Sequence, residues 1–323
     1  MSPTFFFLDA GTGRERTRFQ YPARIRDALD YGNSPRATPL IASGRAYLLG
    51  AFGHLHCVDV ATGQLVWATH LAEEFGARRP QWGYAGSPLL VGERLIVQPG
   101  GPNASLVALD AATGDMLWES PGRPASYAGF ITAKIRGQTQ LIGLDSETLG
   151  GWDPATGGRL WELSPATKGD FNVPSPFMVG QRLFIASENN GARMHDFDAQ
   201  GRLIAQPVAH HEALDPDAHT PVPVGEHIVG LGTSLLCLRK NDLRPAWSAD
   251  TKLGTYAAMI SDGKTLVLTL SDDCTLHLHD VSRPTELATL RLTKESLHLL
   301  AHPTLVGNRL CIRLGQSAVC LQL

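Results

Sequence analysis

The stretch Asp110-Ala-Ala-Thr113-Gly114-Asp-Met-Leu-Trp118 decides the fold of this chain, because the same pattern recurs along it. The pattern Asp-x-x-Thr-Gly-x-x-x-Trp is complete again at Asp59–Trp67 and at Asp153–Trp161. Degenerate copies lie around Asp9, Asp198, Arg239 and Asp280. The copies are spaced at roughly 40–50 residues, a period that is typical of stacked supersecondary units.

Each copy predicts a hairpin corner. Apolar residues such as those at 106–109 precede the Asp and predict a buried strand. The Asp carboxylate can accept backbone N–H groups in the turn, and the Gly supplies the positive φ that a bulged hairpin loop needs. A second strand follows and carries the Trp. We expect its large ring to fill the wedge between two neighbouring twisted sheets.

A second pattern precedes each corner and adds two more strands. It consists of an apolar run, a Val-Gly or Asp-Gly turn and another apolar run, as in residues 87–97 and 175–185. Four antiparallel strands per unit form the blade of a β-propeller. The units begin near residues 38, 87, 128, 175, 220, 257 and 303. The sequence therefore predicts an all-β, seven-bladed propeller that occupies residues 1–323 as a single domain.

The two chain ends indicate how such a propeller closes. The last unit stops after a third strand at 318–322, whereas residues 5–9 and 14–20 read as a third and a fourth strand. Propellers often complete the last blade with an N-terminal strand, which removes an open sheet edge. We therefore expect residues 1–20 to supply the closing strands, with 14–20 as the fourth strand of the last blade. The alternative is an eight-bladed propeller with an incomplete first blade.

Composition narrows the class of partner. The net charge is −3 and no basic run occurs, which disfavours nucleic-acid binding because phosphate contacts need clustered Lys and Arg. The Arg78-Arg79 pair is interpreted as part of a solvated loop. No apolar stretch reaches the ~18 residues of a membrane span, and a monomer is expected. The N-terminal residues lack a basic region and a cleavage site, so the chain as written predicts a cytoplasmic protein.

The five cysteines form no metal-binding or redox motif. Cys57, Cys237 and Cys320 occupy equivalent positions, two residues before a corner, where the second unit has Ala108. This position predicts a small core residue, so the three are interpreted as buried free thiols. Disulfides between blades would have to span too great a distance.

The motif Ala-x-Asp-x-x-Thr-Gly-x-x-x-Trp, complete at Ala108–Trp118, resembles the tryptophan-docking repeat of quinoproteins. The whole chain is similar to the bacterial pyrroloquinoline quinone (PQQ)-like β-propeller proteins. These include catalytic quinoprotein dehydrogenases and a non-catalytic outer-membrane assembly lipoprotein. The resemblance implies PQQ and calcium for the catalytic members, which have eight blades and a vicinal Cys-Cys pair. This chain is shorter and has no adjacent cysteines. Members often carry an N-terminal extension and are exported, so a longer N-terminus would predict a periplasmic or extracellular location.

Candidate ligand-binding residues follow from the expected positions of the loops. In a propeller, the loops that enter the first strand and those that join the second to the third crowd one mouth of an axial funnel. The candidates are Asn33, Arg36, His54, Trp82, Tyr84, Tyr127, Asn172, Arg193, His219, Tyr256 and His302. They suit a planar polar ligand, because rings stack on Tyr or Trp and an Arg holds a carboxylate bidentately. The alternative is that they hydrogen-bond loop backbones and water.

Two metal sites are also considered. Glu188 and Asn189, together with Asp145, could offer hard oxygen ligands to calcium. His54, His219 and His302 could bind zinc if they converge, which would permit hydrolysis by a metal-bound water.

Three functions remain open at this point. The chain contains no Gly-x-Ser-x-Gly, no P-loop and no His-Glu-x-x-His, so a non-catalytic propeller that binds a small polar ligand or a protein at its funnel or loop face is favoured. The first alternative is a PQQ- and calcium-dependent quinoprotein dehydrogenase of alcohols or sugars. The second is a metal-dependent hydrolase of esters, lactones or phosphoesters. The sequence leaves open whether the protein is an enzyme.

Overall fold

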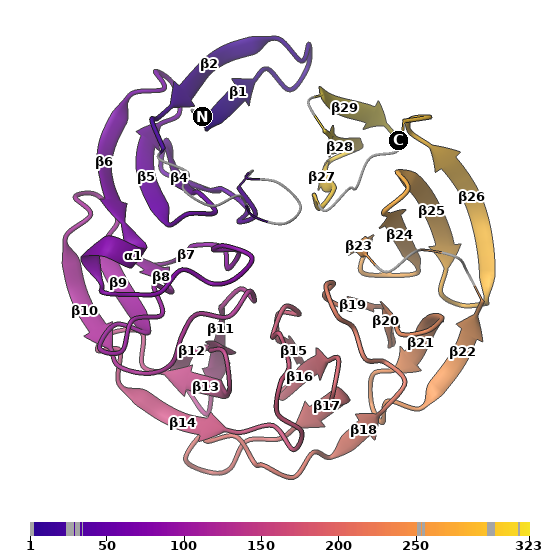
Figure 1. Cartoon of the computed structure of the whole chain (residues 1–323). Helices are drawn as coiled ribbons and strands as arrows, with labels where there is room; N and C mark the ends of the chain where they lie inside the picture. The colour runs from indigo at the N-terminus through magenta and orange to yellow at the C-terminus, as the bar shows by residue number, and fades with distance from the viewer. Residues whose placement is uncertain are drawn as a thin grey trace. The chain divides into compact units, whose positions relative to one another are not determined.

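The computed structural model describes residues 3–23, 29, 33, 35–250, 253, 256–295, 301–315 and 317–323. The chain divides into two compact units, and each is described by itself. The first comprises residues 1–165 with 199–202, and the second comprises 166–198 with 203–323. Strands dominate both units, and the one short helix among the described residues is α1 (Leu71–Glu74) (Figure 1).

The first unit contains a hairpin and three four-stranded antiparallel sheets, blades 1 to 3. The hairpin is β1 (Thr4–Leu8) and β2 (Glu15–Gln20). Blade 1 is β3 (Leu40–Ala42), β4 (Arg45–Leu49), β5 (His54–Asp59) and β6 (Leu65–His70). Blade 2 is β7 (Leu89–Val91), β8 (Arg94–Val97), β9 (Leu106–Asp110) and β10 (Met116–Ser120). Blade 3 is β11 (Ile131–Ile135), β12 (Gln138–Leu144), β13 (Leu149–Trp152) and β14 (Arg159–Leu163).

The second unit contains three four-stranded antiparallel sheets and one three-stranded sheet, blades 4 to 7. Blade 4 is β15 (Phe177–Val179), β16 (Arg182–Ser187), β17 (Gly191–His195) and β18 (Ala209–His211). Blade 5 is β19 (Val222–Val224), β20 (His227–Leu231), β21 (Leu235–Arg239) and β22 (Pro245–Ala249). Blade 6 is β23 (Ala257–Ser261), β24 (Leu266–Ser271), β25 (Thr275–Asp280) and β26 (Thr285–Arg291). Blade 7 is β27 (Thr304–Val306), β28 (Arg309–Leu314) and β29 (Ser317–Gln322).

The fold class predicted from the repeat is confirmed: the chain is all-β, with seven blades of antiparallel strands that follow one another in chain order. The seven first strands begin at Leu40, Leu89, Ile131, Phe177, Val222, Ala257 and Thr304. These positions lie close to the unit starts expected from the sequence. The period of the corner motif therefore fixes the period of the sheets.

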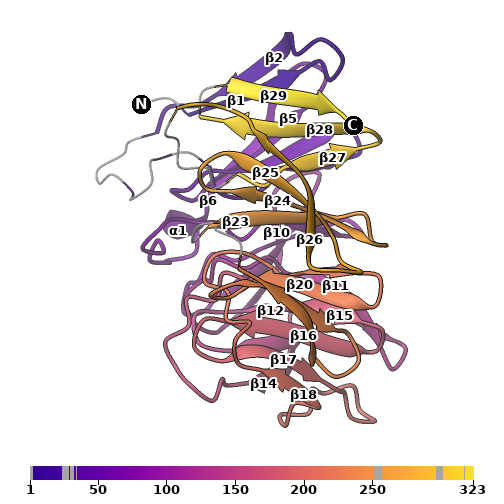
Figure 2. The ribbon, with the colours of Figure 1, turned by 90° about the vertical axis from the view of Figure 1, so that its right-hand side faces the viewer.

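The chain ends differ in detail from the expected closing arrangement. Residues 15–20 pair with residues 4–8 in a sheet of their own, and β29 pairs with β28 in blade 7 (Figure 2). In neither of these two described sheets do residues 14–20 pair with a strand of the last blade, as the sequence had led us to expect. Asp9 forms a local hairpin corner, in which its Oδ1 accepts the backbone N–H of Thr12 at 2.9 Å. That corner folds β2 back onto β1.

The corners have the predicted chemistry. Asp59 Oδ1 accepts both the backbone N–H and the hydroxyl of Thr62, each at 2.8 Å, and Gly63 has φ +72°. Asp110 Oδ1 accepts the backbone N–H of Thr113 at 2.9 Å. These hydrogen bonds favour the ionised carboxyl, and the bond from the Thr62 side chain is the largest cause that lowers the pKa of Asp59.

Each docking Trp reaches the corner of the next blade. Trp67 Nε1 donates to the carbonyl of Ala111 at 3.1 Å, and Trp118 Nε1 donates to that of Pro154 at 3.1 Å. In the second unit, Trp247 Nε1 donates to the carbonyl of Val281 at 2.8 Å. In every case the acceptor is the residue that follows the first corner position of the next repeat. The predicted role of the Trp between neighbouring blades is confirmed.

The corner glycine serves this docking as well as the turn. A Cβ placed on Gly114 would lie 2.8 Å from Cδ2 of Trp67, and one on Gly157 would overlap the ring of Trp118. The glycine of the motif therefore meets two requirements at once. It permits the positive φ of the turn, and it leaves room for the indole of the preceding blade.

Trp161 docks through an intermediary. Its Nε1 donates to Oε1 of Gln140 at 2.7 Å, and Nε2 of Gln140 donates to the carbonyl of Gly201 at 2.9 Å. Gln140 is only 1% exposed. The next corner, at Asp198–Gly201, lacks the Thr-Gly pair, and the amide of Gln140 replaces the direct contact.

Apolar cores lie between successive blades of each unit. In the first unit, Tyr47, Leu55 and Trp67 of blade 1 pack with Leu95 and Val107 of blade 2. In the second unit, Phe184 and Met194 of blade 4 pack with Ile228 and Leu238 of blade 5.

The predicted burial of the cysteines holds for two of the three positions. Cys57 and Cys237 are buried, whereas Cys320 is exposed. The interpretation of Cys320 as a buried thiol was therefore wrong. In blades 1 and 5 this slot faces a packed core, but no described residue covers the face of β29 that carries Cys320.

Replacement of Trp118 by Ala should lower the free energy of unfolding by about 3–5 kcal/mol, because the change leaves a cavity between blades 2 and 3. The matched control is Leu117→Ala, since Leu117 is the next residue on β10 and is 48% exposed. Urea unfolding of both variants checks this expectation. A loss below about 1 kcal/mol for Trp118→Ala would mean that the indole is not wedged between the blades.

Candidate functional site

One group of predicted residues comes together at the loops of the first unit, and we call it the Arg36–Arg79 cluster. It comprises Arg36 before β3, Phe52 between β4 and β5, Arg79 and Trp82 between α1 and β7, and Tyr127 before β11. The rings of Trp82 and Tyr127 lie 5.4 Å apart, and the Tyr127 hydroxyl accepts the backbone N–H of Trp82 at 3.4 Å. The guanidinium of Arg79 lies 5.4 Å from the centre of the Phe52 ring.

Two cations lie in this partly buried part of the surface, and each is near enough to affect the other electrostatically. Burial lowers the pKa of Arg36, and the positive charge of Arg79 lowers it further. Burial is also the largest cause that raises the pKa of Tyr127. Like charges in a site of reduced dielectric disfavour one another, and a bound anion would offset that cost. The arrangement is therefore suited to a negatively charged group beside aromatic rings.

The interpretation of Arg78 and Arg79 as part of a solvated loop holds for Arg78 and not for Arg79. Arg78 is exposed, but Arg79 is half-buried against Phe52. Phe52 and Arg79 are both site residues that the sequence reasoning missed. Their positions in the sequence could have identified them as site residues. Arg79 lies in the same loop as the predicted Trp82, and Phe52 lies in a predicted loop between a second and a third strand.

Other predicted residues of the first unit have structural partners. The hydroxyl of Tyr84 donates to the carbonyl of Pro99 at 3.0 Å, and Oδ1 of Asn33 accepts the backbone N–H of Leu29 at 2.9 Å. The ring of His54 packs 4.4 Å from His70 and 5.1 Å from Tyr21. These contacts tie Tyr84 to the loop after β8, join Asn33 to Leu29 and pack Tyr21 and His70 around His54 of blade 1.

The predicted residues of the second unit lie on β17 and in the loops before β15, β19, β23 and β27. Asn172 is buried with φ +56°, and Arg193 Nη2 donates to the Ser187 hydroxyl at 3.0 Å. His219 Nε2 accepts the backbone N–H of Leu231 at 2.9 Å. Tyr256 is half-buried just before β23, and His302 lies on the surface before β27.

The three histidines considered for zinc do not lie in one unit. His219 and His302 belong to the second unit. Burial is the main cause that lowers the pKa of His219 to about 4, and the charge of the nearby His302 lowers it further. His54 belongs to the first unit. Neither unit by itself contains the three-His set.

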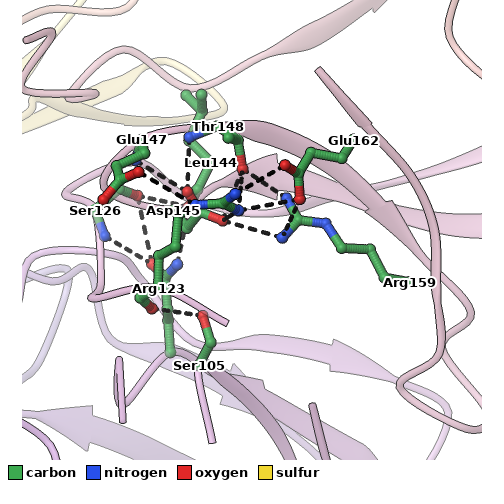
Figure 3. A network of polar contacts seen from close by, with 10 residues as sticks. Ser105, Arg123, Ser126, Leu144, Asp145, Glu147, Thr148, Arg159 and Glu162 are labelled. Atoms are coloured by element: carbon green, nitrogen blue, oxygen red, sulfur yellow. Dashed lines mark hydrogen bonds and ion pairs between the residues drawn. The ribbon is translucent and has the colours of Figure 1, made fainter. Parts of the chain in front are cut away.

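Asp145, considered for calcium, lies at the centre of an ion-pair network in blade 3 (Figure 3). Its fully buried carboxylate lies 3.2 Å from Nη1 of Arg159 and 3.5 Å from Nη1 of Arg123, and accepts the Thr148 hydroxyl at 2.8 Å. Arg123 also pairs with Glu162 at 2.8 Å. Two guanidinium groups beside one carboxylate make a poor environment for a further cation. The network therefore acts as a clamp that joins the loops around β12 to β14.

The other two calcium candidates also contribute to loop structure. The backbone N–H of Phe171 donates to Glu188, and the backbone N–H of Asn189 donates to Oδ1 of Asp170 at 2.9 Å. Burial raises the pKa of Glu188, with the charges of Asp170 and Asp217 acting in the same direction. Within the described ranges, no group of three or more His, Cys, Asp or Glu side chains could hold a metal ion. The calcium and zinc hypotheses gain no support from this geometry.

One arrangement in blade 6 has the order of a nucleophile, a base and an acid. Ser271 Oγ lies 3.5 Å from Nε2 of His277, and Nδ1 of His277 lies 2.9 Å from Glu286. Ser271 is only 1% exposed, however, and its hydroxyl donates to Asp273 at 2.6 Å. A hydroxyl without access, whose proton is directed at a carboxylate, is not set up for nucleophilic attack. The arrangement instead ties the β24–β25 turn to β26.

Comparison with known proteins places the chain in a family. Residues 7–249 match the family described as outer membrane protein assembly factor BamB. The chain belongs to this family of PQQ-like β-propeller proteins. A comparison with curated proteins gave no match.

Several solved structures share the fold of this PQQ-like propeller. BamB from Moraxella catarrhalis is 17% identical, with a TM-score of 0.64 over 95% of this chain and 85% of that chain. A quinohemoprotein alcohol dehydrogenase from Pseudomonas putida is 13% identical, with a TM-score of 0.69 over 97% of this chain and 67% of that one. A europium-containing methanol dehydrogenase is 12% identical, with a TM-score of 0.69 over 96% and 78% of the two chains. At these identities the likeness concerns the fold alone. No helix in the described part of this propeller has the length and apolarity to span a bilayer.

The histidine pair of blade 1 predicts a specific pH dependence of stability. His56 is buried between Phe19 and Tyr21, at ring distances of 4.9 and 4.2 Å, and burial lowers its pKa to about 4. Because the folded pKa lies below the ordinary value of 6.5, acid favours the unfolded chain, and stability is lost as the pH falls from about 6.5 to about 4.

His56→Phe should therefore reduce the loss of stability between pH 7 and pH 5 by about 2 kcal/mol. Urea unfolding of wild type and variant at both pH values measures this difference. Between pH 7 and pH 8 the two proteins should change in parallel, which serves as the control. An equal loss in both proteins between pH 7 and pH 5 would contradict the burial of a neutral imidazole at this position.

Proposed function

We propose that this protein is a non-catalytic binding propeller, and that the Arg36–Arg79 cluster takes an acidic segment of a protein partner. The observation that carries the proposal is that half-buried Arg36 and Arg79 are near enough to act on one another electrostatically, beside the rings of Phe52, Trp82 and Tyr127. A guanidinium holds a carboxylate through two parallel hydrogen bonds, and aromatic rings add apolar contact area at low entropic cost. Arg, Trp and Tyr are also the residues enriched at binding hot spots.

A protein partner is favoured over a small ligand by two considerations. The family that matches residues 7–249 is described as an assembly factor, and that role in the relative supports protein binding here. The cluster is also assembled from the loops of three successive blades rather than from one strand end. Loops that extend from a rigid scaffold are a common location for recognition surfaces.

A binding role agrees with the state of the other candidate groups. The Asp145 carboxylate is held by Arg123 and Arg159, and the buried His219 accepts a backbone N–H. These contacts support structural roles for residues that a catalytic mechanism would need to leave available. The likeness to quinoprotein dehydrogenases, at 12–13% identity, supports a shared fold and does not by itself support their reactions.

The binding test uses a fluorescently labelled copolymer of glutamate and tyrosine as the probe, with a lysine–tyrosine copolymer as the charge-reversed control. Fluorescence anisotropy at low ionic strength should show binding of the acidic probe alone. Arg36→Gln/Arg79→Gln should weaken that binding at least tenfold, because hydrogen bonds between charged groups contribute about 1.5–3 kcal/mol each.

Arg78→Gln is the matched control, since it removes the same charge from the exposed neighbour of Arg79. It should change the affinity less than about threefold, because exposed charges contribute little to specific contacts. Equal losses in the Arg78 and Arg36/Arg79 variants would mean that the probe responds to net charge only. No binding of the acidic probe by the wild type would overturn the proposed site.

A further inference from the structure

Two cysteines of blade 7 face each other across neighbouring strands. Cys311 on β28 and Cys320 on β29 are register partners, and their sulfur atoms lie 2.8 Å apart. This separation is shorter than ordinary van der Waals contact between two sulfur atoms. Cys320 is exposed and Cys311 is half-buried, whereas the other three cysteines of the chain are buried. Cys311 and Cys320 are therefore the two thiols that a reagent in solution can reach most easily.

The strand register suits a covalent bond between the two sulfurs. The backbone N–H of Leu323 donates to the carbonyl of Asn308, which marks these residues as a hydrogen-bonded pair of the antiparallel ladder. Pairs alternate along the ladder, so Cys311 and Cys320 form a non-hydrogen-bonded pair. The Cα atoms of such pairs are about 4.5 Å apart, within the range of roughly 4.4–6.8 Å that a disulfide spans. The bond can form without a shift of either strand.

We propose that Cys311 and Cys320 are a thiol–disulfide redox pair that cross-links β28 to β29 reversibly. The oxidant is a low-molecular-weight disulfide. The thiolate of one cysteine attacks a sulfur of that disulfide, forms a mixed disulfide and releases one thiol. The second cysteine then attacks the protein sulfur of the mixed disulfide and releases the second thiol. One external disulfide is reduced to two thiols, and the two cysteines lose two hydrogens.

The surroundings indicate the order of attack. Arg309 and Arg313 lie two residues on either side of Cys311, so all three occupy the same face of β28. Cationic neighbours favour a thiolate and attract an anionic disulfide such as oxidised glutathione. Cys320 is exposed whereas Cys311 is half-buried, so Cys320 is the more accessible sulfur and reacts first, and Cys311 resolves the mixed disulfide.

The cross-link would act on the last strand of the described sheet. Blade 7 has three described strands, and β29 pairs with β28 alone. Figure 2 shows β28 and β29 side by side near the C-terminus. Oxidation would add a covalent link to a strand that is otherwise held, among the described residues, by backbone hydrogen bonds to β28 and by the packing of Val319 and Leu321. Reduction would restore its freedom to open locally.

The first test is chemical. The purified protein is incubated with oxidised glutathione, denatured, alkylated with N-ethylmaleimide and digested for mass spectrometry. We expect a linked Cys311–Cys320 peptide that has lost two hydrogens, while Cys57, Cys237 and Cys274 carry maleimide as internal controls. Recovery of both Cys311 and Cys320 as maleimide adducts, or of a separate glutathionyl group on each, would overturn the proposal.

Two conservative variants test the order of attack and the effect on the strand. With oxidised glutathione, Cys311→Ser should accumulate a stable glutathione adduct at Cys320. Cys320→Ser should react with oxidised glutathione at least tenfold more slowly than the wild type. In hydrogen exchange, oxidised wild type should exchange the amides of 317–322 at least tenfold more slowly than reduced protein, and neither variant should show this difference. Unchanged exchange after confirmed cross-linking would overturn the proposed hold on β29.

Discussion

The contact between the indole of one blade and the corner of the next is the interaction on which this structure depends. A four-stranded blade cannot bury both of its faces alone, so its stability comes from its neighbours. The indole of Trp118 contributes apolar area, one hydrogen bond to Pro154 and close packing on Gly157, all within one contact. Because the Asp and Thr of the same corner hold its backbone through local hydrogen bonds, the acceptor is already positioned when the Trp arrives.

This dependence explains why the repeat tolerates some losses and not others. Gln140 joins Trp161 to Gly201 where the next corner has lost its Thr-Gly pair. The corner after Trp247 lacks glycine, but its backbone carbonyl at Val281 still accepts the indole N–H. The geometry of the acceptor carbonyl is thus kept even where the side chains of the motif are not. The loops between these corners are free of that constraint, which is why they can carry the Arg36–Arg79 cluster.

The fold could be predicted from the sequence because its signal is periodic and local. Asp59, Thr62, Gly63 and Trp67 each have a role that follows from residue chemistry and spacing. The candidate site could be predicted only in part, because its members meet through long-range packing. Arg36, Trp82 and Tyr127 were identified from their loops, but the half-buried state of Arg79 depends on Phe52, a residue from another loop.

The same limit applies to the charged and thiol groups. The sequence alone allows Asp145 to be a metal ligand, but in the fold Arg123 and Arg159 lie beside its carboxylate. No sequence motif links either arginine to Asp145. Cys320 shares a sequence slot with the buried Cys57, but a slot is buried only when another sheet covers it. Sequence position predicts the face of a strand, whereas the packing around that face must be observed.

A double-mutant cycle between Trp118 and Gly157 measures the docking of the indole on the next corner, with Gly137→Ala as the reference. Gly137 also has a positive φ, but a Cβ there would meet no atom within 4 Å. We expect Gly157→Ala to destabilise the wild type by about 1–3 kcal/mol more than Gly137→Ala. In the Trp118→Ala background the two substitutions should cost the same, because the cavity accepts the methyl group. An excess cost at Gly157 that persists without the indole would contradict the claim that this glycine exists to receive it.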